Sequence, residues 1–186
     1  MLRTYAFVDG GHIRSGLEEI GVTWDEIDLR KLAAVALQWI DPKWQGERMA
    51  LSRVFVYDAV SETATATDRV DRWLTRNDEQ MDVHVRRGQL ILDRRNQPKR
   101  QKGVDVQLAV DALRFASSGV LDVALFLAAD ADFAPLLEAV RDAGPLVAVC
   151  CFRGKLSDRL REAADRIGYL PDDAVAWQGW KLPALS

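Results

Sequence analysis

The chain has 186 residues, of which 48% are apolar and 28% are charged, with a formal net charge of −3. This length and composition favour one soluble globular domain with a sizeable core. No run approaches the roughly 18 apolar residues of a membrane span, and no charged and then apolar signal segment opens the sequence. We therefore expect a cytoplasmic protein that does not contact membranes.

Apolar runs and helical periods alternate from the amino end of the chain. Residues 3–8 are expected to form a strand, followed by a tight turn at residues 9–12, whose two glycines allow a close backbone approach, and a short helix over residues 13–20. The next helix is expected to follow an N-cap at Asp28 and to end at Pro42. The runs 53–57 and 81–85 predict two more strands, separated by a helix over about residues 67–77.

The second half of the chain continues the alternation. Residues 86–88 predict a turn, residues 89–92 a short edge or hairpin strand, and residues 94–100 a loop before the helix that starts near Gly103. Strands are expected at 121–128 and 146–152, helices at 133–142 and 156–164, and a further short strand at 167–170. This order predicts an α/β fold with a central parallel sheet of about five strands and helices on both faces.

The tail after this domain contains two tryptophans, Trp177 and Trp180. Core packing is the default for such side chains, and the alternative is exposure for stacking on a base or for a partner surface. We expect a domain over residues 1–172 and a tryptophan-containing tail over residues 173–186.

Acidic residues follow the predicted strands or open a helix at the same edge of the sheet. Asp9 ends the first strand, Asp130 and Asp132 follow the strand 121–128, and Asp105 lies in the first turn of the helix before that strand. In an open parallel sheet, ligands bind beyond the carboxyl ends of the strands, where the strand order reverses. Each acid alone has a plainer reading, since Asp9 and Asp132 can cap helices and Asp105 can favour a helix dipole. Those readings do not explain why all four lie at one edge.

Four carboxylates without matching bases repel each other, and this repulsion raises their pKa values. A divalent cation resolves the repulsion, and hard oxygen ligands with an incomplete protein shell suit Mg²⁺ or Mn²⁺. Such an ion lowers the pKa of a bound water and positions it for attack on phosphorus. The four aspartates therefore predict a metal centre that hydrolyses phosphodiester bonds.

Positive charge is concentrated between residues 86 and 102, a segment with seven basic residues and one acidic residue, Asp93. Lys and Arg contacts to phosphates supply most of the affinity for nucleic acid that is independent of base sequence. Each of these residues taken alone can be an ordinary surface residue. For Lys102, next to the acids, the alternative to a contact with phosphate is a solvated position in the loop. Together they predict a surface that contacts a nucleic-acid backbone, formed by Arg86, Arg87, Arg94, Arg95, Lys99, Arg100 and Lys102.

Three segments together resemble the signature segments of NYN domains, which are PIN-like nucleases: residues 7–12 (FVDGGH), 102–111 (KGVDVQLAVD) and 129–136 (ADADFAPL). The resemblance extends over most of residues 3–172. It implies a Rossmann-like PIN fold, a metal-dependent ribonuclease activity on single-stranded or structured RNA, and an acidic centre at the positions of Asp9, Asp105, Asp130 and Asp132. A homodimer is compatible with the sequence.

Three positions depart from the family pattern. His12 stands where Asn is usual, and the third segment has Ala128-Ala129 and Ala131 where Ser-Gly and Ser are usual. His12 is a candidate contact to phosphate or to water at the scissile bond, and its alternative is a polar surface role. The missing hydroxyls weaken the orientation of the carboxylates or a substrate contact. The alternative function is therefore a catalytically silent PIN-like module that binds RNA or regulates.

Overall fold

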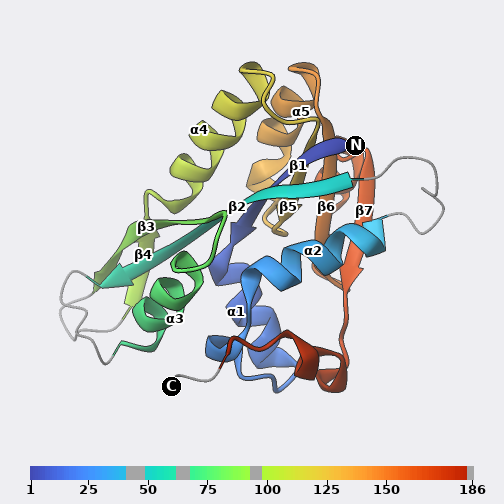
Figure 1. Ribbon diagram of the computed structural model, residues 1–186. Helices are drawn as coiled ribbons and strands as arrows, with labels where there is room; N and C mark the ends of the chain where they lie inside the picture. Colours follow the sequence, from blue (N-terminus) through green and yellow to red (C-terminus); the bar gives the residue numbers. More distant parts are fainter. Residues whose placement is uncertain (41–48, 62–67, 93–97, 184–186) are drawn as a thin grey trace.

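The computed structural model describes residues 1–40, 49–61, 68–92 and 98–183. Strands and helices alternate along most of the chain, as the sequence predicts (Figure 1). The strands are β1 (Leu2–Asp9), β2 (Met49–Ser61), β3 (Val83–Leu92), β4 (Pro98–Lys102), β5 (Val123–Leu127), β6 (Leu146–Phe152) and β7 (Arg166–Leu170). The α-helices are α1 (Gly10–Glu19), α2 (Leu29–Ile40), α3 (Arg69–Asp78), α4 (Val104–Ser117), α5 (Ala134–Asp142) and α6 (Asp158–Ala163), and the 3-10 helices are η1 (Trp24–Glu26), η2 (Ala131–Phe133) and η3 (Ala174–Trp180).

The strands form one sheet in the order β4-β3-β2-β1-β5-β6-β7. All neighbouring pairs from β3 to β7 are parallel, and β4 pairs antiparallel with β3 at one edge. The predicted α/β fold with a parallel sheet is confirmed. The sheet exceeds the expected five strands because β7 joins it at one edge and the β3–β4 hairpin widens it at the other.

Helices cover both faces of the sheet, and each face has its own core (Figure 1). Alternate strand residues such as Val8 and Val56 pack with α1, α2 and α3 on one face. Their neighbours Phe7 and Phe55 pack with α4, α5 and α6 on the other, and their rings stack with centroids 5.9 Å apart. Because both faces are buried, the strands are continuous apolar runs rather than alternating ones.

The predicted turn at residues 86–88 is wrong, since β3 continues through it and pairs in register with β2 from Val83 to Leu90. Gly88 marks a close approach of another segment instead of a turn. A Cβ there would lie 2.5 Å from Cγ2 of Val104 and 2.9 Å from the carbonyl oxygen of Lys102. The predicted loop 94–100 is also partly wrong, because Pro98 already belongs to β4; residues 93–97 lie outside the described part of the chain.

The segment after β7 packs against the same face as α1 and α2. Trp177 is buried, and its ring centroid lies 5.9 Å from that of Phe152 and 4.7 Å from that of the half-buried Trp180. Core packing, rather than exposure, is thus the role of Trp177. Within the residues that the structure describes, no helix combines the length and the apolar character needed to cross a bilayer.

Candidate active site

The strand order reverses at β1, which lies between β2 and β5 in the sheet. The chain leaves β1 for β2 on one side, and it later enters β5 on the other side, so a crevice is expected beyond the carboxyl ends of β1 and β5. Asp9 is the last residue of β1, and Asp130 follows β5 by three residues. Asp105 lies in the first turn of α4, which precedes β5 in the chain. The topology thus brings these acids to the predicted edge.

Asp9 joins β1 to α1 and caps the helix. Its side-chain oxygen accepts a hydrogen bond of 3.1 Å from the backbone N–H of His12. The pKa of Asp9 is raised to about 6: burial is the main cause, the carboxylates of Asp58 and Asp105 add to the rise, and the His12 N–H opposes it. Asp9 therefore has the capping role that its position predicts and also lies in the field of two other acids.

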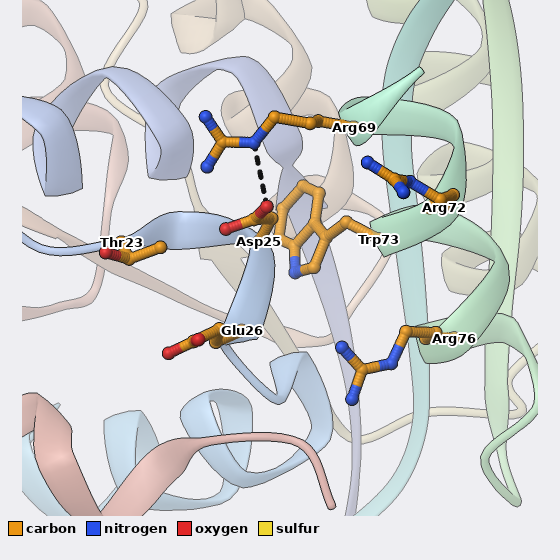
Figure 2. A pocket seen from close by; sticks show the side chains of 7 residues that line it. All are labelled: Thr23, Asp25, Glu26, Arg69, Arg72, Trp73 and Arg76. Carbon is orange, nitrogen blue, oxygen red and sulfur yellow. Dashed lines mark hydrogen bonds and ion pairs between the residues drawn. The ribbon is translucent and has the colours of Figure 1, made fainter. Parts of the chain in front are cut away.

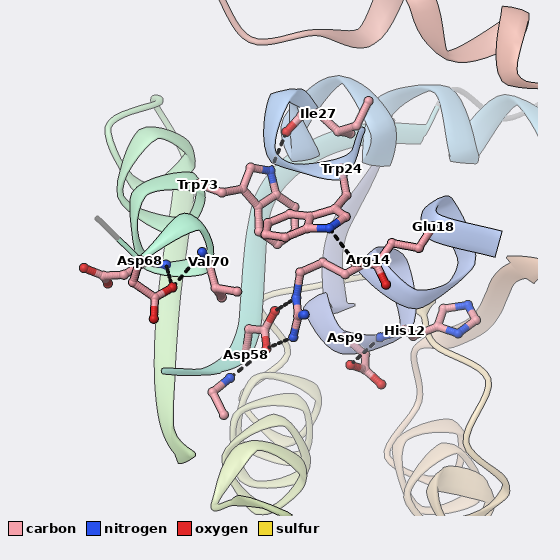
Figure 3. Close-up of polar contacts among 12 residues, drawn as sticks. Asp9, His12, Arg14, Glu18, Trp24, Ile27, Asp58, Asp68, Val70 and Trp73 are labelled. Carbon is pink, nitrogen blue, oxygen red and sulfur yellow. Dashed lines mark hydrogen bonds and ion pairs between the residues drawn. The ribbon is translucent and has the colours of Figure 1, made fainter. Parts of the chain in front are cut away.

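Asp58 is the acidic residue of this edge that the sequence analysis did not select. It is fully buried in β2, directly after Tyr57. Tyr57 is the residue of β2 that pairs with Asp9 of β1. Arg14 of α1 donates two hydrogen bonds to its carboxylate, of 2.7 and 2.9 Å, and the N–H of Ala59 donates a third of 2.8 Å (Figure 3). The signal was present, since Asp58 follows an apolar run just as Asp9 does.

Gly10, the residue after Asp9, leaves the space in which the carboxylate of Asp58 lies beneath the turn. A Cβ on Gly10 would lie 2.6 Å from Oδ2 of Asp58. Only glycine leaves room for the carboxylate against the backbone of α1. The expected close approach at the Asp9–His12 segment is therefore real, and the group approached is the Asp58–Arg14 ion pair.

Three of the four predicted acids line one pocket of about 220 Å³: Asp105, Asp130 and Asp132. Asp130 caps η2, since its Oδ1 accepts a hydrogen bond of 2.9 Å from the N–H of Asp132. Partial burial raises the pKa of Asp105, and the charges of Asp130 and Asp132 add to the rise. The apolar part of the lining comes from Val106, Ala109, Phe133 and Leu136.

Among the described residues, none of the four acids has an ion-pair partner, in contrast to Asp58, which Arg14 neutralises. The acids act on each other through space, since Asp105 contributes to the raised pKa of Asp9 while Asp130 and Asp132 contribute to that of Asp105. Over the same residues, no three His, Cys, Asp or Glu side chains are gathered closely enough to hold a metal ion. The edge thus combines uncompensated negative charge with an all-oxygen donor set.

The ring of His12 points away from Asp9, as Figure 3 shows, and packs edge-on against Phe152 with centroids 5.5 Å apart. Its pKa is lowered to about 4, chiefly by burial and in addition by the positive charge of Lys155. The imidazole is therefore neutral at pH 7. Its Nε2 is buried and has no hydrogen-bond partner within the described residues.

Among the described residues, the two predicted basic residues of β3 have separate partners. Arg86 donates a hydrogen bond of 3.2 Å to the buried Asp111, which also accepts bonds from Tyr57 and Arg114. Arg87, the next residue of β3, instead pairs with Asp71 and Asp78. Successive residues of a strand point to opposite faces, so these two guanidiniums lie on different sides of the sheet.

The remaining basic candidates lie on or near β4. Lys102 is exposed at its end, one residue before the N-cap of α4, and is thereby close in sequence to Asp105. The backbones of Lys99 and Arg100 belong to β4, which pairs with β3 through Ile91–Arg100 and its neighbours. Arg94 and Arg95 lie outside the described residues.

Comparisons with known proteins bear on the whole chain. The family model of the NYN domain matches residues 3–171. A crystal structure of a protein of unknown function from Vibrio parahaemolyticus has a similar fold, with a TM-score of 0.65 and 19% sequence identity over 92% of this chain and 94% of that chain. A search of curated protein sequences finds no match.

Proposed function

Because the chain belongs to the NYN domain family, whose members are PIN-like nucleases, we propose that it is a divalent-metal-dependent endoribonuclease. Family membership supports a nuclease-type function. The finer proposal is that the protein hydrolyses RNA phosphodiester bonds at a centre formed by Asp9, Asp105, Asp130 and Asp132. One observation carries it: at the edge where strand order reverses, these acids have no basic partner among the described residues, and the pKa values of Asp9 and Asp105 are raised.

The donor set fits Mg²⁺ or Mn²⁺, since these ions prefer carboxylate oxygens and keep several waters when the protein shell is incomplete. Either ion would take its protein oxygens from Asp9 and from Asp105, Asp130 and Asp132, which line one pocket. Because the described side chains do not gather three of these acids around one point, waters would supply most of the ion's shell. When bound, the ion supplies a water of lowered pKa and offsets charge on the phosphate.

The residues themselves position the reactants. The hydrogen bond from the His12 N–H fixes the carboxylate of Asp9, and the Asp58–Arg14 pair beneath Gly10 fixes the turn that carries it. In the hydrolysis, the oxygen of a water forms the new P–O bond, a carboxylate takes the proton of that water, and the oxygen that leaves phosphorus gains a proton from solvent. The side chains of Phe133 and Leu136 give the pocket an apolar wall beside these acids.

RNA is the proposed substrate because NYN domains are generally ribonucleases, and basic residues beside the acids would contact its phosphates. Lys102 is exposed next to Asp105 and would contact a phosphate. Arg86, Arg87, Arg94, Arg95, Lys99 and Arg100 would add contacts, and those of Arg86 and Arg87 require exchange of their present ion pairs. His12 has a supporting rather than a contacting position in this proposal, since its ring packs on Phe152.

The test is cleavage of end-labelled RNA and DNA oligonucleotides by the parent protein and by Asp130→Asn, each with Mn²⁺, Mg²⁺ or EDTA. We expect cutting of RNA that needs metal and that falls at least about 100-fold in the variant, as for removal of a group used in the transition state. Asp142→Asn, which changes an exposed acid at the end of α5, is the matched control.

The second candidate is a catalytically silent module that binds RNA. The alanines at positions 128 and 131 favour it, because the resemblance places serine, which bears a hydroxyl, at those positions of the family. RNA binding that persists in EDTA, with no metal-dependent cutting by the parent protein, would establish this candidate and reject the nuclease.

A further inference from the structure

A second pocket, of about 340 Å³, lies between η1 and α3 on the helical layer that contains α1 and α2 (Figure 2). One wall is a row of three arginines, Arg69, Arg72 and Arg76, which share a face of α3 because they are three and four residues apart. The row spans about 10 Å along the helix axis. Figure 2 shows Trp73 between Asp25 of η1 and the side chains of Arg72 and Arg76, while the guanidinium of Arg69 reaches over to Asp25.

The charges in this pocket do not balance. The acids of the opposite wall are Asp25, which pairs with Arg69 at 2.8 Å, and Glu26, which pairs with Lys181 outside the pocket. Arg76 donates a hydrogen bond of 2.6 Å to the carbonyl of Pro183, which carries no charge. Arg72 is exposed and has no ion-pair partner within the described part of the chain. The pocket therefore offers positive charge to an anion.

The wall behind the arginines is rigid. Trp73 is buried, and its Nε1 donates a hydrogen bond of 2.9 Å to the carbonyl of Ile27. Its ring meets that of Trp24 edge-on, with centroids 5.4 Å apart. The buried tryptophan thus anchors α3 against η1 and fixes the backbone positions from which the arginines extend.

The pocket is linked to the acidic edge through Trp24. The guanidinium carbon of Arg69 lies 5.0 Å from the centroid of the Trp24 ring, and that of Arg14 lies 5.4 Å from the same centroid. Arg14 in turn binds Asp58, the carboxylate beside Asp9 (Figure 3). A chain of contacts thus runs from the arginine pocket to the first acid of the candidate active site.

We propose that Arg69, Arg72 and Arg76 bind the phosphate backbone of an RNA strand outside the bond that is cut, on the α3 side of the acidic edge. This inference rests on the proposed function, because it takes RNA as the ligand. Guanidinium forks match phosphate oxygens and form charge-assisted hydrogen bonds. The buried tryptophan offers no exposed ring for a base, so the binding is independent of base sequence.

The test is binding of a fluorescein-labelled single-stranded RNA of mixed sequence to the full chain in EDTA, followed by anisotropy over a range of salt concentrations. Arg72→Gln is compared with Arg53→Gln, an exposed arginine on β2 that loses the same charge and lies outside the pocket. We expect Arg72→Gln to weaken binding about tenfold at low salt. The slope of log K against log salt should also fall by about 0.7, as expected for one lost contact to a single strand.

Equal affinities and equal salt slopes for Arg72→Gln and Arg53→Gln would overturn the inference, as would the absence of RNA binding by the parent protein. The failure of the proposed function looks different. Arg72-dependent binding without metal-dependent cutting keeps this inference and rejects the nuclease. Metal-dependent cutting with binding that is unaffected by Arg72→Gln keeps the nuclease and rejects the inference.

Discussion

Replacing Asp9 by Asn should stabilise the metal-free protein at neutral pH, although Asp9 caps a helix. The pKa of Asp9 is raised to about 6, chiefly by burial and then by Asp58 and Asp105, from about 3.9 in an unfolded chain. The folded state therefore holds this proton more tightly, and the free energy of unfolding falls as pH rises from about 4 to about 6. The difference in pKa corresponds to at most about 3 kcal/mol above pH 6.

Asn at position 9 does not ionise, so the fall in unfolding free energy with rising pH disappears. Its side-chain oxygen still accepts a hydrogen bond from the His12 N–H, since Asn and Asp cap helices about equally well. In EDTA at pH 8, the Tm of Asp9→Asn should exceed that of the parent by up to roughly 10 °C, and the difference should vanish near pH 4. Thermal denaturation followed by circular dichroism measures both. Asp68→Asn, at the N-cap of α3, is the control that should give no such gain. A variant no more stable than the parent at pH 8 would refute the reasoning.

Three further predictions follow from particular contacts. Arg14→Met should cost about 3–5 kcal/mol of unfolding free energy in urea denaturation, because it leaves the buried Asp58 unpaired, and adding Asp58→Asn should recover part of that loss. Gly88→Ala should cost about 1–3 kcal/mol in the same assay, and Val104→Ala should partly restore stability by removing the nearest contact. In thermal scans at pH 8, Mn²⁺ should raise the Tm of the parent more than that of Asp130→Asn, whereas an equal rise in both would argue against a metal ligand at this position.

The sequence was most informative where the backbone alone decides the outcome. Apolar runs that end at acids predicted β1 and β5, and the parallel connectivity then required Asp9 and Asp130 to lie at one edge. Asp111 lies six residues after Asp105 on α4, about 240° around the helix, and it pairs with Arg86 and Arg114 instead of joining the other acids.

The errors arose where contacts distant in sequence decide. The segment around Gly88 has the composition of a turn, but pairing with β2 keeps it extended, and the glycine serves the approach of Val104. The orientation of His12 was equally hidden, because its environment comes from Phe152 and Lys155, which are far along the chain. Local composition does not contain these neighbours.

Ion pairing then separates the acids of the edge into two kinds. Asp58 lies in β2, next to the residue that pairs with Asp9, yet Arg14 reaches it from the second turn of α1 and makes it part of the scaffold. Asp111 is compensated in the same way by Arg86 and Arg114. Within the described part of the chain, the carboxylate of Asp9 accepts only from the backbone, and burial together with the charges of Asp58 and Asp105 raises its pKa. Arginines thus pair with Asp58 and Asp111, which hold the site in place. The four acids of the proposed metal centre have no such partner among the described residues, so their negative charge is left for the proposed divalent ion.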